Sequence, residues 1–129
     1  MADNPVASLT PEHQDFYERF QSFWAAPSGK RIPELIAPEA TIHFPGAGTF
    51  SGADYGAVMG EMLTTRADMQ VTPLDCAGNG DRLYIAWESS ASINGERRTW
   101  MGVDRFLIKN GMAIEEQVIF DSAVLQPGD

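Results

Sequence analysis

Residues 79–111 read NGDRLYIAWESSASINGERRTWMGVDRFLIKNG and contain three Asn-Gly steps, at 79–80, 94–95 and 110–111. Asn-Gly suits the two central positions of a type I′ turn, because both positions need φ > 0 and this turn matches the twist of paired antiparallel strands. The steps lie 15 (94 − 79) and 16 (110 − 94) residues apart, which leaves room for long strands between them. Long strands in one meander twist and curl. The second half of the chain is therefore predicted to form a curled antiparallel sheet.

The first half of the chain is predicted to supply helices that fill this curl. Thr10 and Pro11 suit the N-cap and the first residue of a helix, where proline's missing N–H costs nothing. An aromatic stripe follows at helical spacing, formed by Phe16, Tyr17, Phe20, Phe23 and Trp24. Most of this stripe is expected to be core.

Two further helices and a short strand complete the predicted order. A short helix over 32–36 ends before Pro38, because proline disfavours helical geometry in the residue that precedes it. Residues 40–44 alternate as a strand, and a third helix begins after Ser51 and ends near Arg66. This order predicts an α+β fold in which three helices pack on one face of a strongly curved, mostly antiparallel sheet.

Size and charge bound the class of protein. A chain of 129 residues is expected to form one domain, spanning 1–129. Its formal net charge of −9 repels phosphate backbones and anionic lipid, so neither nucleic acid nor a membrane is an expected partner. The single cysteine, Cys76, has no intrachain partner, and the N-terminus lacks the basic start and apolar stretch of a signal peptide. A soluble cytoplasmic protein is predicted.

The sequence carries no clear motif for a cofactor or a metal. The glycine-rich run 46–52 lies between a strand and a helix, but its third glycine is misplaced for a dinucleotide-binding loop. His13 and His43 are the only histidines, and neither belongs to a pattern with metal-ligand spacing. No cofactor and no metal site is therefore predicted.

Asp104 is the first candidate for chemistry. By alternation it shares a strand face with Trp100, Gly102 and Phe106, so its carboxyl group is expected to lie among rings and bare backbone. Burial favours the neutral carboxyl, which can donate a strong hydrogen bond to a developing oxyanion. The alternative is an exposed carboxylate on the convex face, paired with Arg105 or an arginine of the next strand.

Three more polar side chains are candidates for the same cavity. His43, at the end of the first strand, is either a general base near neutral pH or a structural histidine. Tyr17 is a candidate phenol donor, and Asp121 either reaches the cavity or caps the turn that follows it. The predicted substrate-binding walls are formed by Phe20, Trp24, Trp87, Trp100 and Ile119.

Short motifs occur in order along most of the chain: IHFPG (42–46), FSG (50–52), AW (86–87), GVDRF (102–106), NG (110–111), IE (114–115) and FD (120–121). Together they resemble the NTF2-like superfamily, and within it the SnoaL-like and ketosteroid-isomerase-like branch. The resemblance implies a cystatin-like conical barrel whose concave face closes over an apolar pocket. It also implies a homodimer formed through the convex face of the sheet.

The resemblance implies roles for the candidate residues. Asp104 falls where ketosteroid isomerases carry a protonated aspartate, His43 where they carry their aspartate base, and Tyr17 approximately where they carry a tyrosine. Asp121 resembles the aspartate of SnoaL-like polyketide cyclases. The resulting hypothesis is a cofactor-independent isomerase- or cyclase-like enzyme that transfers protons on a small apolar carbonyl compound. The alternatives are a ligand carrier without chemistry and a non-catalytic binding or dimerisation module.

Overall fold

The computed structural model describes residues 9–125. Along the chain its elements are α1 (Pro11–Ala25), the 3₁₀ helix η2 (Gly29–Glu34), β1 (Ile36–Phe44), β2 (Gly48–Ser51), α2 (Gly52–Thr65), β3 (Gln70–Asn79), β4 (Arg82–Ile93), β5 (Glu96–Lys109), β6 (Met112–Ile119) and the 3₁₀ helix η3 (Ser122–Leu125). The strands form one sheet in the order β2-β1-β6-β5-β4-β3. β1 and β6 pair in parallel, and the other neighbours are antiparallel.

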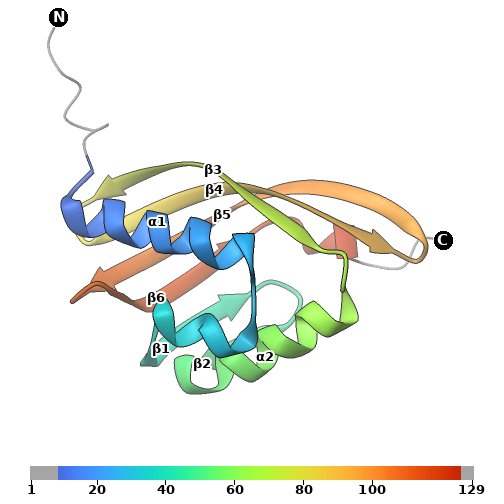
Figure 1. The fold of residues 1–129 in the computed structure, drawn as a ribbon, viewed down its shortest axis with the longest axis horizontal. Coiled ribbons are helices and arrows are strands. Elements are labelled where there is room, and N and C mark those ends of the chain that lie inside the picture. Colours follow the sequence, from blue (N-terminus) through green and yellow to red (C-terminus); the bar gives the residue numbers. More distant parts are fainter. Residues whose placement is uncertain (1–8, 126–129) are drawn as a thin grey trace, which may run out of the picture.

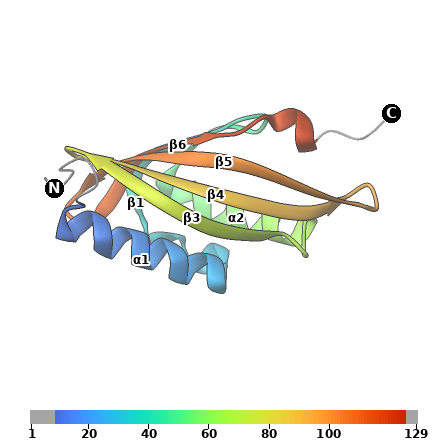
Figure 2. The same cartoon turned by 90° about the horizontal axis from the view of Figure 1, so that it is seen from above.

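The sheet is curled rather than closed, and the helices cover its concave face (Figure 1). α1 runs along β3, as Figure 2 shows from above, and α2 packs against β1 and η2. The arrangement confirms the predicted α+β class with three helices in the first half of the chain. No helix within residues 9–125 is long and apolar enough to cross a membrane.

The predicted helix starts are confirmed by their capping contacts. Thr10 Oγ1 accepts a hydrogen bond from the His13 N–H at 3.0 Å, which satisfies one of the free donors at the start of α1. Ser51 Oγ does the same for the Asp54 N–H at 3.1 Å at the start of α2. Both helices therefore begin where the sequence predicts, and Arg66 follows α2 as its C-cap.

The hairpin prediction is correct at the second and third Asn-Gly steps, and the turn at the first step is shifted by one residue. Asn94 and Gly95 have φ of 54° and 78°, and Asn110 and Gly111 have 53° and 79°, as a type I′ turn requires. In the first hairpin Asn79 instead pairs with Arg82, so the central residues are 80 and 81. Only the first of these, a glycine, has a positive φ (63°), which is typical of a type II′ turn.

The region between α1 and α2 differs from the prediction. The second helix is a 3₁₀ turn that ends at Glu34, and Ile36 already belongs to β1, where it pairs with Ala113. β2, which the sequence analysis missed, pairs with the end of β1. The glycine-rich turn before it, with Gly46 and Gly48 at positive φ, reverses the chain between the two strands.

The core lies between α1 and the sheet. Phe16, Phe20 and Phe23 are buried, and Phe16 meets Phe106 of β5 edge to face with ring centroids 4.8 Å apart. The stripe predicted on α1 is therefore mostly core, whereas Trp24 is only partly buried at the helix end. Beside this core, open space remains between the helices and the central strands.

Candidate active site

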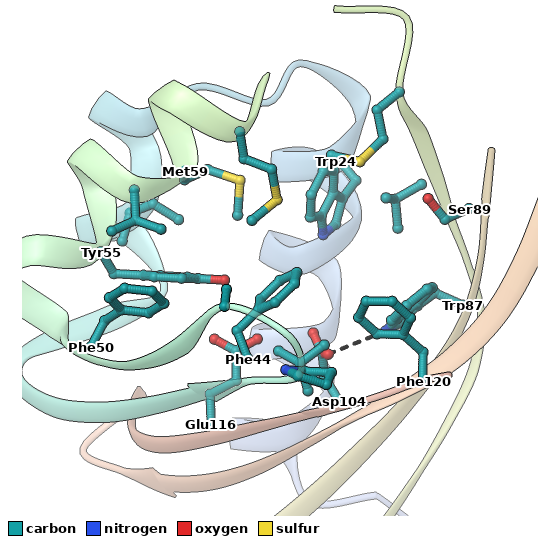
Figure 3. Close-up of a pocket in the computed structure, with 18 of the residues that line it drawn as sticks. Trp24, Phe44, Phe50, Tyr55, Met59, Trp87, Ser89, Asp104, Glu116 and Phe120 are labelled. Carbon is teal, nitrogen blue, oxygen red and sulfur yellow. Dashed lines mark hydrogen bonds between the residues drawn. The ribbon is translucent and has the colours of Figure 1, made fainter. Parts of the chain in front are cut away.

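A cavity of about 510 Å³ lies between the concave face of the sheet and the helices (Figure 3). Most of its lining is aromatic or aliphatic and comes from α1, η2, α2 and the strands β1 to β6. Its volume falls within the range of small-molecule sites, roughly 300–1,000 Å³. The polar groups buried in this lining are Ser89, Asp104, Glu116 and the phenol of Tyr55.

Asp104 and Glu116 form a carboxyl pair on the floor of the cavity. In the β5–β6 register Asp104 faces Val118 and Phe106 faces Glu116, so the two acids are diagonal neighbours on one face of the sheet. Each is only 5% exposed, and their side chains share a hydrogen bond. Two carboxyl groups can share such a bond only when one of them keeps its proton.

Burial and mutual contact separate the proton affinities of the pair. Burial raises the pKa of Asp104 from its ordinary 3.8 to about 6, while hydrogen bonds from Glu116 and Trp87 limit the rise. Burial also raises the pKa of Glu116 well above its ordinary 4.5, and the charge of Asp104 and their hydrogen bond raise it further. Both shifts favour a pair that keeps one proton between its two carboxyl groups over a pair in which both are ionised.

Trp87 holds Asp104 in place from the neighbouring strand. Its indole Nε1–H donates to Asp104 Oδ1 at 3.2 Å, as the dashed line in Figure 3 marks. The ring lies directly over Gly102, where a Cβ would collide with Trp87 and come within 2.7 Å of the Ile119 carbonyl oxygen. A glycine at this position of β5 is therefore what allows the indole to lie flat against the strand.

Tyr55 brings a phenol to the pair from α2. It is 2% exposed, and its ring stacks on Phe50 with centroids 6.3 Å apart. Burial raises the pKa of Tyr55 well above 10.0, and the nearby Glu116 and Asp104 carboxyls raise it further. The phenol is therefore a permanent hydrogen-bond donor on the side of the cavity opposite the sheet.

A sequence profile of the SnoaL-like domain matches residues 14–116. The chain belongs to the SnoaL-like family. A search of curated protein sequences gives no match. Within residues 9–125 of this SnoaL-like domain, no group of three or more His, Cys, Asp or Glu side chains is arranged to hold a metal ion.

Solved structures share the fold of this SnoaL-like domain at low sequence identity. An NTF2-like protein of unknown function from Burkholderia pseudomallei has a TM-score of 0.77 and 19% identity, over 88% of this chain and 94% of that one. A putative polyketide cyclase from Acidithiobacillus ferrooxidans has a TM-score of 0.75 and 16% identity, over 92% of this chain and 94% of that one. IdmH, a putative polyketide cyclase from Streptomyces antibioticus, has a TM-score of 0.74 and 18% identity, over 88% of this chain and 94% of that one. These similarities confirm the expected NTF2-like fold.

Several of the residues chosen from the sequence line the cavity of the SnoaL-like domain. Asp104 is buried there, and the alternative of an exposed carboxylate paired with Arg105 is wrong. Four of the five predicted wall residues also line the cavity, namely Phe20, Trp24, Trp87 and Trp100. The fifth, Ile119, is 48% exposed on the opposite face of β6.

His43 does not face Asp104 across the cavity, and that prediction is wrong. Ile42 and Phe44 turn toward the interior, so alternation along β1 directs His43 to the convex face. There its Nδ1 lies 3.1 Å from Thr49 Oγ1 of β2. A base acting in this cavity must therefore come from another strand.

Tyr17 and Asp121 also lie outside the cavity lining. Tyr17 faces β3, where burial and the neighbouring Cys76 and Asp75 raise the pKa of its phenol. Asp121 is exposed, and its Oδ1 accepts a hydrogen bond from the Ala123 N–H at 3.0 Å. The turn-capping alternative for Asp121 is therefore correct.

Glu116, Tyr55 and Ser89 are the polar groups that the sequence analysis missed. Counting back in twos from Phe120 through Val118 places Glu116 on an apolar face of β6, which is the same signal that identified Asp104. Tyr55 occupies the inward face of α2 with Met59, at helical spacing. For Ser89 the alternation with the buried Trp87 was the available signal.

Proposed function

We propose that this SnoaL-like domain is an acid–base enzyme, isomerase- or cyclase-like, that moves a proton on a small and largely apolar carbonyl compound without a cofactor. One observation carries the proposal: two buried carboxyl groups share a hydrogen bond on the floor of an apolar cavity and hold one proton between them. Such a pair offers a base and an acid at the same pH, which is what proton transfer on a carbonyl compound needs.

In the proposed step Asp104 is the base. Its carboxylate takes the proton from the carbon next to the substrate carbonyl, and the electron pair of the broken C–H bond forms the C=C bond of an enol. Glu116 gives its proton to the carbonyl oxygen, while Tyr55 donates a hydrogen bond to the same atom. Asp104 then gives its proton to another carbon of a conjugated enol while the enol O–H returns its proton to Glu116, which restores the carbonyl and completes an isomerisation. Alternatively, the enol carbon attacks a second carbonyl, whose oxygen takes the proton from Asp104 while the enol O–H returns its proton to Glu116, which completes a ring closure.

Deuterium exchange provides the test. 2-Tetralone is an enolisable bicyclic ketone, and its loss of ¹H at the carbon next to the carbonyl in D₂O is measured by NMR. Asp104→Asn and Glu116→Gln are each expected to lower the enzyme-dependent kcat/KM by about 10²–10⁴-fold. Asp121→Asn and Glu115→Gln make the same chemical changes outside the cavity and are expected to exchange like the wild type. Unchanged exchange in both cavity variants contradicts the assignment.

The ligand carrier is the alternative that this experiment separates. An open cavity of about 510 Å³ supports it over a module whose own side chains fill the pocket. A carrier predicts that 2-tetralone binds, that its binding quenches tryptophan fluorescence, and that exchange is no faster than in buffer. Binding with buffer-level exchange would therefore replace the enzyme assignment by the carrier.

We also propose that a second copy of the chain packs on the convex face. Met101 of β5 is 60% exposed, and Val103 follows it by two residues on the same face. The cross-strand partner of Val103 is Ile119, which is 48% exposed. Neighbouring exposed apolar side chains on a sheet are typical of an interaction surface. Met101→Glu is expected to convert a dimer to a monomer in light scattering, whereas an unchanged mass contradicts this interface.

A further inference from the structure

Ser89 is a buried hydroxyl with no hydrogen-bond partner inside the protein. It is 2% exposed, and its Oγ is the one buried side-chain nitrogen or oxygen without a partner among the described residues. Burying a hydroxyl without a partner is unfavourable by an amount comparable to a lost hydrogen bond, so native proteins rarely retain such a group without a use. The other serines of β4 show the contrast: Ser90 Oγ accepts from Arg97 Nη2 at 2.7 Å and Ser92 Oγ donates to Asp68 Oδ2 at 2.6 Å.

The position of Ser89 directs its hydroxyl into the cavity. Alternation along β4 places Ser89 on the same face as Trp87, and both residues line the cavity (Figure 3). Its partners in the neighbouring strands are Val71 and Trp100, so the hydroxyl is framed by apolar and aromatic side chains. A group that enters the cavity is the partner this hydroxyl lacks.

Ser89 and the carboxyl pair lie at different ends of the cavity, as Figure 3 shows. Ser89 faces Trp100 in the register, and Asp104 follows Trp100 by four residues on β5. Four residues of a strand span ~13 Å between Cα atoms. A ligand that contacts both ends must therefore carry two polar groups separated by an apolar skeleton.

We propose that Ser89 determines substrate specificity by binding a second, uncharged oxygen group of the substrate, at the end remote from its reacting carbonyl. This inference rests on the proposed function, which places the reacting carbonyl at Asp104 and Glu116. A serine hydroxyl both donates and accepts, so it pairs equally with a hydroxyl or a carbonyl oxygen. The group is uncharged because a carboxylate beside Val71 and Trp100 would be desolvated without a compensating cation.

Binding of paired ligands tests the inference without using turnover. Wild type is titrated by calorimetry with 2-tetralone and with its 6-hydroxy and 7-hydroxy derivatives, which add one oxygen on the far ring. At least one derivative is expected to bind about tenfold more tightly than 2-tetralone, the value of one good hydrogen bond to a buried group. Ser89→Ala is expected to abolish this preference and to leave the affinity for 2-tetralone itself unchanged.

A matched control and a stability readout exclude a merely structural role. Ser90→Ala makes the same change one residue away on the opposite face of β4 and is expected to keep the preference. Because the Ser89 hydroxyl lacks a partner in the ligand-free protein, Ser89→Ala is expected to melt at the same or a higher temperature than the wild type. A lowered melting temperature would show a partner within the protein and overturn the inference.

Three further results would overturn the inference. The first is that the wild type shows no preference for either hydroxylated ligand, and the second is that a preference survives in Ser89→Ala. The third is that the 6-carboxylate analogue binds more tightly than the hydroxylated ligands, which would assign the far group to the cavity-lining Arg66. Failure of the proposed function looks different. 2-Tetralone lacks the far oxygen, so unchanged exchange in Asp104→Asn and Glu116→Gln rejects the chemistry while the Ser89-dependent preference persists.

Discussion

Trp87 and Asp104 are joined across β4 and β5 by a hydrogen bond in which the indole Nε1–H donates to Asp104 Oδ1 at 3.2 Å. The donor stabilises the ionised form of a carboxyl group that burial would otherwise keep neutral, so it opposes the rise in the pKa of Asp104. The same indole forms part of the cavity wall. One side chain therefore shapes the site and sets the pH at which its proposed base is ionised.

Replacing this donor is expected to shift the pH dependence of the reaction. Trp87→Phe keeps an aromatic wall but removes the N–H, so the pKa of Asp104 is expected to rise above about 6. Because the base must be ionised, the acidic limb of the kcat/KM profile for 2-tetralone exchange moves to higher pH. A limb that stays in place or moves to lower pH would contradict the role given to this hydrogen bond.

Gly102 is expected to tolerate no side chain. Gly102→Ala places a Cβ against the Trp87 ring and the Ile119 carbonyl, so the free energy of unfolding is expected to fall by about 1–3 kcal/mol. Gly60→Ala is the matched control, since nothing lies within 4 Å of a Cβ on that α2 residue. It is expected to stabilise the protein by about 0.4–1 kcal/mol through helix propensity and reduced chain entropy. Urea denaturation measures both, and equal effects would contradict the close packing at Gly102.

The carboxyl pair is expected to make the protein less stable as pH rises. Because the pKa values of Asp104 and Glu116 are raised in the folded state, the native protein binds more protons than the unfolded chain above about pH 4. The stabilisation is complete below the ordinary values of 3.8 and 4.5, and it is lost as pH rises through the folded pKa values. Each retained proton contributes a slope of about 1.4 kcal/mol per pH unit.

Glu116→Gln isolates this dependence. Above about pH 7, one unit over its folded pKa of about 6, Asp104 is mostly ionised in both states, so the remaining slope belongs to Glu116 and is expected to disappear in the variant. Glu34, Asp68 and Glu115 have lowered pKa values and therefore act only below about pH 4.5. Urea denaturation between pH 7 and 8 measures the slope, and an equally steep loss of stability in Glu116→Gln would contradict the retained proton.

His43 is expected to be dispensable for chemistry. It lies on the convex face beside Thr49 and contributes to lowering the pKa of Glu115 there. His43→Gln should therefore leave the rate of 2-tetralone exchange unchanged. A loss of exchange as large as that of Asp104→Asn would show that the imidazole reaches the cavity after all.

Local signals in the sequence were sufficient for the starts of α1 and α2 and for the hairpin turns at Asn94-Gly95 and Asn110-Gly111. Capping by Thr10 and Ser51 and the positive φ of Asn94 and Asn110 follow from interactions within a few residues, so the sequence contains them directly. Asp104 was a candidate because Trp100 and Phe106 share its strand face, but Met101 and Val103 make the opposite face apolar too, so the exposed alternative stayed open.

The wrong assignments of Ile119 and His43 depend on strand parity and register. β6 carries apolar residues on both faces, Val118 inward and Ile119 outward, so its alternation alone does not identify the buried side. A register shift between Leu107 and Ile108 further separates the two halves of the β5–β6 pair. For His43 the alternation with Ile42 already indicated the outer face. The expectation of a base there, which rested on its place at the end of the first strand and on the family resemblance, was wrong.

The most direct test of the account is a ¹³C NMR titration of the Asp104 and Glu116 side-chain carboxyl carbons in the ligand-free protein. The account predicts that Asp104 loses its proton near pH 6 and that Glu116 loses its proton well above its ordinary pKa of 4.5. Ionisation of both groups near 4, as in a solvent-exposed pair, would contradict the shared proton on which the proposed chemistry depends.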